Sequence, residues 1–80
     1  MKEMFSLDKI PVNVPHKIMY IKDCANKLRL EELGFTENCI VTAVHISPFG
    51  DPVAYHVRGT IIALREEDSK NIIIRQKEVY

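Results

Sequence analysis

The segment from Ser47 to Arg65 constrains the fold more than any other part of this 80-residue chain. It begins with the turn sequence Pro-Phe-Gly-Asp-Pro at 48–52, in which glycine supplies a positive φ angle and proline presets a backbone angle. Apolar residues then alternate with less apolar ones, a period of two that predicts a strand with one buried face. The apolar positions of this strand are Val53, Tyr55 and Val57.

The apolar pattern resumes after Arg58-Gly59, so this pair predicts a turn into another strand. β-branched and aromatic residues predict the remaining strands at 16–22, 39–46 and 71–75. Residues 26–35 read as a short helix, with Asp23 as the predicted N-cap and Gly34 just past the last turn. Short helical turns are predicted at 7–10 and 66–70, and a loosely held tail at 77–80.

Five short strands, with one short helix inserted after the first, predict a mainly β fold. A bent sheet of this size must close on itself or leave an apolar face in water. We therefore expect a small five-stranded SH3-like barrel, partly open, that curls around five side chains: Val53, Tyr55, Val57, Ile62 and Leu64.

Length and composition predict one domain over residues 1–80 that works in the cytoplasm. Eleven basic and eleven acidic side chains cancel, which argues against a bulk electrostatic grip on nucleic acid or on a membrane. No apolar run approaches the roughly 18 residues of a membrane span, and no signal peptide is recognisable. Cys24 and Cys39 have no metal-binding or redox spacing, so we expect reduced thiols.

Four short motifs in a fixed order resemble the FeoA-like domain family: LEELGF at 30–35, GDP at 50–52, VRG at 57–59 and ALR at 63–65. The resemblance covers about residues 6–76 and implies an SH3-like barrel. It also implies a small cytoplasmic partner of the FeoB ferrous iron transporter, which carries out no reaction itself and modulates uptake. The chain departs from the family at Asn38, where glycine is usual, but asparagine is the next-best residue for a positive φ angle.

Five residues are candidates for contact with such a partner: Leu28, Arg29, Phe49, Asp51 and Arg58. An aromatic ring at the tip of a rigid turn loses little entropy on docking, although the turn sequence is also explained by structure alone. Leu28 lies about 160° from Leu30 around a helix, so either the helix is wedged into a groove or Leu28 is exposed. For Arg58, a salt bridge with Asp51 and a partner contact both stay open.

A further hypothesis is a binding site for a transition metal ion that uses histidine ligands. If the hairpin is symmetric about its turn, His45 and His56 lie opposite each other, with Cβ atoms about 5 Å apart. A structural zinc site requires four ligands. Neither His16 nor the two cysteines offers a convincing third or fourth, so no cofactor is predicted.

The residues favour no enzyme, because the sequence has no phosphate loop and no nucleophile beside a histidine-acid pair. Two other functions stay open. The chain could be a stand-alone regulatory barrel related to the C-terminal domain of iron-dependent repressors, although it has no recognition helix. It could also be a small nucleic-acid-binding barrel, against which zero net charge and few aromatic residues argue. Self-association is left open.

Overall fold

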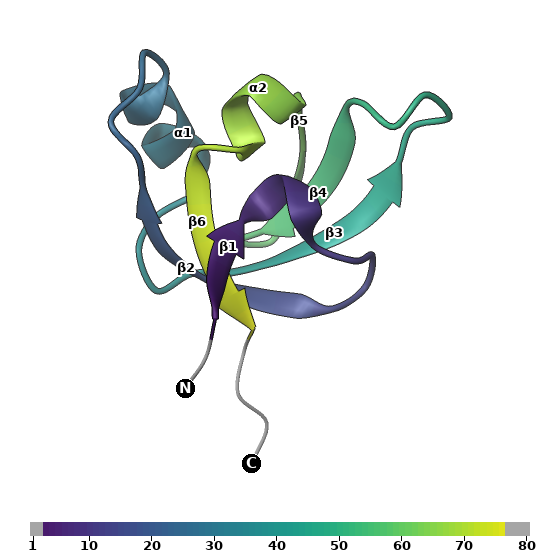
Figure 1. Ribbon diagram of the computed structural model, residues 1–80, viewed down its shortest axis with the longest axis horizontal. Helices are drawn as coiled ribbons and strands as arrows, with labels where there is room; N and C mark the ends of the chain where they lie inside the picture. The colour runs from purple at the N-terminus through teal and green to yellow at the C-terminus, as the bar shows by residue number, and fades with distance from the viewer. Residues whose placement is uncertain (1–2, 77–80) are drawn as a thin grey trace.

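Residues 3–76 are described by the computed structural model, and within them six antiparallel strands form one curved sheet (Figure 1). The strand order across the sheet is β1-β6-β2-β3-β4-β5. The strands are β1 (Met4–Ser6), β2 (Pro15–Ile21), β3 (Ile40–Ile46), β4 (Val53–Val57), β5 (Thr60–Leu64) and β6 (Ile72–Gln76). The same residues 3–76 form three short helices: η1 (Leu7–Lys9), a 3-10 turn, and the α-helices α1 (Lys27–Leu33) and α2 (Glu66–Ser69).

The mainly β fold is confirmed, but the expected count of five strands is wrong. The additional strand is β1, whose three residues pair with β6. A strand of three residues is too short to show a periodic pattern, and its place is decided by a partner about seventy positions away. Helix α1 therefore follows the second strand. The predicted tail at 77–80 lies outside the described residues.

Helix α1 ends where expected and begins later than expected. Gly34 has φ 116°, and its N–H donates to the carbonyl of Glu31 at 3.0 Å, so a residue without a Cβ closes the helix. Asp23 does not cap the helix, because the first helical residue is Lys27 and Asn26 occupies the cap position. The Asn26 amide instead donates to a carboxylate oxygen of Asp68 at 2.9 Å, which ties α1 to α2.

Two turns depend on non-glycine residues with positive φ angles, one between β4 and β5 and one before β3. Arg58 and Gly59 both have positive φ angles, 51° and 78°, and they connect Val57 to its pairing partner Thr60. This is the geometry of a two-residue type I′ hairpin. Asn38 has φ 72°, so its predicted left-handed conformation before β3 is confirmed.

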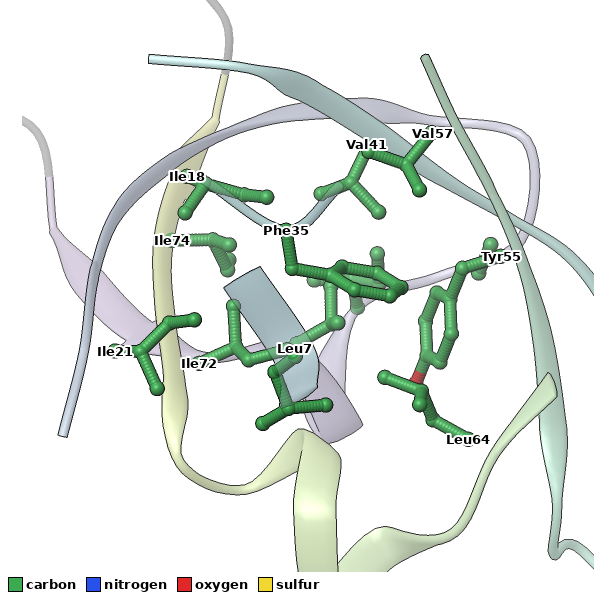
Figure 2. Close-up of a cluster of buried hydrophobic side chains, with 13 residues drawn as sticks. Leu7, Ile18, Ile21, Phe35, Val41, Tyr55, Val57, Leu64, Ile72 and Ile74 are labelled. Carbon is green, nitrogen blue, oxygen red and sulfur yellow. The ribbon is translucent and has the colours of Figure 1, made fainter. Parts of the chain in front are cut away.

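The core lies inside the curved sheet and is covered by the helices, as Figure 2 shows for its labelled side chains. Tyr55 and Phe35 meet edge to face, with ring centroids 6.5 Å apart. Of the five side chains predicted to line the core, Tyr55, Val57 and Leu64 are buried, while Val53 and Ile62 are partly buried against the cluster. The prediction that the alternating residues Val53, Tyr55 and Val57 form the inward face of β4 is therefore confirmed.

Candidate partner-binding surface

Phe49 stands at the tip of the loop between β3 and β4 with 97% of its surface exposed. The loop is tight, because the Gly50 N–H donates to the Ser47 carbonyl at 2.8 Å. A large apolar side chain that a short turn holds in water buries no surface and so does not stabilise the fold. It is therefore available for contact with another molecule.

Asp51 in the same loop holds the loop against α2. Its Oδ1 accepts the Glu66 N–H at 2.9 Å, which satisfies a backbone donor at the start of that helix. Its Oδ2 lies 3.9 Å from the Arg65 guanidinium, the one ion pair found within residues 3–76. The salt bridge between Arg58 and Asp51 considered from the sequence is therefore wrong, and Asp51 has a structural role.

Arg58 lies instead against the end of α1. A Cβ built on Gly34 would approach the Cδ of Arg58 to 3.2 Å, so the aliphatic part of the arginine covers the glycine. The VRG motif at 57–59 thus contacts the LEELGF motif at 30–35. Arg58 is exposed, and its guanidinium is free to point outward from this contact.

Helix α1 buries one leucine and exposes another. Leu30 is fully buried, whereas Leu28 is 69% exposed and Arg29 beside it is also exposed. Wedging of the whole helix into a groove is therefore wrong, and the alternative of an exposed Leu28 is confirmed. Leu28 adds apolar surface next to a positive charge.

The five candidate residues form two groups. Phe49 and Asp51 precede β4, whereas Arg58 follows it, so the length of a five-residue strand, roughly 17 Å, separates them. Arg58 joins the end of α1, the helix that carries Leu28 and Arg29. Helix α1 and the β3–β4 loop lie on opposite sides of the molecule in Figure 1.

The predicted opposition of His45 and His56 is wrong. The hairpin turn places Ile46 opposite Val53, so His45 pairs with Ala54. Beyond a bulge in β3 between Ala43 and His45, His56 pairs with Thr42. The two imidazoles are thus diagonal neighbours on one face, and such pairs have Cα atoms about 7–8 Å apart.

The other ligand candidates lie elsewhere. His16 is buried and its Nδ1 lies 2.9 Å from the Val14 carbonyl, while Cys39 Sγ lies 3.0 Å from the Thr36 hydroxyl. Cys24 and Cys39 are free thiols. Across residues 3–76, no three histidine, cysteine or acidic side chains are grouped closely enough to hold a metal ion.

A small acidic pocket beside the loop was not predicted. It has a volume of about 140 Å³ and is lined by Asp8, Asp51, Glu66 and the buried residues Tyr55 and Ser69. Burial raises the pKa of the Tyr55 hydroxyl, a hydrogen bond with Ser69 lowers it in part, and the charges of Asp8 and Asp51 raise it further. Three acids distant in sequence give no local pattern, so only the fold brings them together.

None of the helices within residues 3–76 has the length and apolar composition needed to cross a membrane. The sequence profile of the FeoA domain matches residues 5–76, which is nearly the whole described chain. The chain belongs to the FeoA family. The four motifs that suggested this family all lie within the match, and this FeoA-family chain has no match among curated proteins.

Solved structures of FeoA proteins share the fold. FeoA from Stenotrophomonas maltophilia, an SH3-domain protein solved with zinc and considered a candidate activating factor of ferrous iron transport, is 30% identical, with TM-score 0.76 over 86% of this chain and 87% of that one. An FeoA-like protein from Clostridium acetobutylicum is 20% identical, with TM-score 0.89 over 100% of this chain and 94% of that one. The SH3-like architecture is therefore confirmed.

Iron(II) transport protein A from Clostridium thermocellum is 22% identical, with TM-score 0.83 over 89% of this chain. This chain spans only 44% of the length of that protein. That likeness therefore concerns the fold of the shared part.

Proposed function

We propose that this chain is a cytoplasmic accessory protein of ferrous iron transport, which binds the cytoplasmic region of an FeoB-type transporter and modulates uptake without catalysing a reaction. The observation that carries the proposal is the FeoA match over residues 5–76. The relation to the S. maltophilia protein, at 30% identity, points in the same direction.

The mechanism we propose is preferential binding to one conformational state of the transporter. A ligand shifts an equilibrium only to the extent that it binds one state more tightly. A shift from 1:99 to 99:1 requires a preference of about 10⁴-fold, so a modest preference would tune uptake gradually.

The docking surface in this proposal is the end of the molecule formed by α1 and the β4–β5 turn, with Leu28, Arg29 and Arg58. Asparagine or glycine adopts the positive φ angles of a type I′ turn at lower cost than arginine does. Arg58 nevertheless holds φ 51° there. Non-glycine residues in the left-handed backbone conformation cost free energy, and they are concentrated at functional sites. Phe49 is the second, separate contact in the proposal.

Binding to the purified cytosolic region of the transporter tests this proposal. Arg58→Asn removes the guanidinium but keeps a residue suited to the turn. Combined with Leu28→Ser, it should weaken binding at least tenfold. Ile61→Ser, which removes another exposed apolar side chain on β5, serves as the control and should leave binding unchanged. Equal binding by all three proteins would overturn the proposed surface.

Metal binding is a second candidate, because the S. maltophilia relative was solved with zinc. In this proposal His45 and His56 supply two imidazole ligands from one face of the β3–β4 hairpin. Two protein ligands are half of what a structural zinc site uses. The remaining ligands would be water or side chains of a partner.

A further inference from the structure

A lysine-lined cleft lies on the side of the molecule where β1, η1 and the junction of α2 with β6 come together. Its volume is about 490 Å³, within the range of ligand sites, and its rim carries Lys9, Lys22 and Lys70. These lysines come from three places in the sequence: the end of η1, the residue after β2 and the residue after α2. The cleft is thus a product of the fold.

Two hydrogen bonds fix the frame of the cleft. The Lys22 N–H donates to the Asn71 carbonyl at 2.8 Å, which brings the end of β2 to the residue after Lys70. The Asn71 side-chain amide donates to the Glu67 carbonyl at 3.0 Å and so holds the end of α2. The stems of Lys22 and Lys70 therefore start from fixed positions.

The cleft is positively charged although the chain as a whole is neutral. All three lysines are exposed, and the one ion pair within residues 3–76 joins Arg65 to Asp51, elsewhere. Asp8 is the single acid in the lining, which leaves an excess of two positive charges. Three lysines held together with a single acid in the lining favour an anionic ligand.

The lining between the lysines is partly apolar, with the side chains of Phe5 and Ile73. Phe5 is only partly buried, and Ile73 is 7% exposed. A ligand that fits this cleft carries acidic groups for the rim and an apolar group for the lining. Small molecules require a pocket that encloses most of their surface, whereas this cleft is more open than enclosed.

We propose that this cleft binds an acidic segment of a partner protein, with glutamate or aspartate side chains paired to Lys9, Lys22 and Lys70 and an apolar side chain on Phe5 and Ile73. Charge complementarity carries the inference. It goes beyond the proposed function, because none of the five predicted transporter-contact residues lines the cleft.

A labelled eight-residue peptide of alternating glutamate and leucine is the probe, measured by fluorescence anisotropy. We expect saturable binding that weakens as salt rises. The triple variant Lys9→Gln, Lys22→Gln, Lys70→Gln should bind at least tenfold more weakly, since several exposed ion pairs are lost together. The matched control, Lys17→Gln, Lys27→Gln, Arg75→Gln, removes the same charge outside the cleft and should lose less than threefold. Circular dichroism confirms that both variants fold.

Equal weakening of peptide binding in both triple variants would show that binding responds to net charge alone, which would overturn the cleft as the binding site. Unchanged binding of the same peptide with glutamine in place of glutamate would overturn the role of its acids. If the protein binds vesicles containing phosphatidylserine more tightly than it binds the peptide, the ligand of the cleft is a membrane surface and the proposal of a protein partner is overturned. Amide chemical shift changes centred on Phe5, Asn71 and Ile73 support the proposal, and changes confined to α1 or the β3–β4 loop contradict it.

Discussion

The side chain of Arg58 covers Gly34: a Cβ at residue 34 would lie 3.2 Å from the Cδ of Arg58. Both residues have positive φ angles, and both lie within the residues that match the FeoA domain. The glycine ends α1 and the arginine turns β4 into β5. The contact therefore joins a helix end to a hairpin turn and places the arginine on the surface that we propose for docking.

Gly34→Ala should lower the free energy of unfolding by about 1–3 kcal/mol, chiefly because φ 116° strains a residue with a Cβ. The close Cδ belongs to a flexible side chain that can move. The coupling with Arg58→Ala in a double-mutant cycle, measured by urea denaturation, should therefore stay below about 0.5 kcal/mol. Gly50→Ala is the control for strain alone, since φ is 87° there and nothing lies within 4 Å of the added Cβ. A larger coupling would show rigid packing of the arginine.

Asp51→Ala should lower the free energy of unfolding by about 1 kcal/mol, because the Glu66 N–H loses its acceptor. Arg65→Ala removes only the long, exposed ion pair and should cost less than about 0.5 kcal/mol. Thermal or urea denaturation of the two variants separates the hydrogen bond from the ion pair. Equal losses in both variants would contradict the capping role.

Phe49→Ala should leave the free energy of unfolding within about 0.5 kcal/mol of the wild type, because the ring is 97% exposed. The same change should weaken binding to the transporter's cytosolic region if Phe49 is its second contact. Denaturation and binding are measured on the same preparation. A clear loss of stability would show that the ring packs against the fold.

Tyr55 should make stability depend on alkaline pH. Its folded-state pKa is raised by burial above the usual value of about 10, so the unfolded chain ionises first as pH rises. The stability contributed by the neutral hydroxyl is complete below about pH 10 and is lost above it, towards the folded pKa. Denaturation between pH 8 and about 11 should show a steeper decline for the wild type than for Tyr55→Phe. Parallel declines would rule out Tyr55 as the cause.

Zinc binding should depend on both exposed histidines of the hairpin, His45 and His56. Calorimetry on metal-stripped protein should give an affinity far below that of a four-ligand site, and His45→Ala and His56→Ala should each weaken it several-fold. Cys24→Ser is the control. Unchanged affinity in both histidine variants would remove this pair from consideration.

Local sequence patterns were sufficient for much of the fold. The alternation at Val53, Tyr55 and Val57 predicted the buried face of β4, and the φ requirements at Gly34 and Asn38 predicted two turns. These features depend on backbone sterics and on a period of two, which neighbouring residues set among themselves. Asp23 failed as a helix cap because several polar residues near a helix start can compete for that position.

The sequence alone determined the β class, the turns and the family, because each rests on residues close together in the chain. Only the tertiary structure decided the register of the β3–β4 hairpin, which sets His45 and His56 apart, and the pairing of Asp51 with α2. It also decided the contact of Arg58 with Gly34 and the meeting of three lysines in one cleft. These relationships join residues far apart in sequence. Their geometry depends on strand register and on how the sheet curves around its core, which no local pattern specifies.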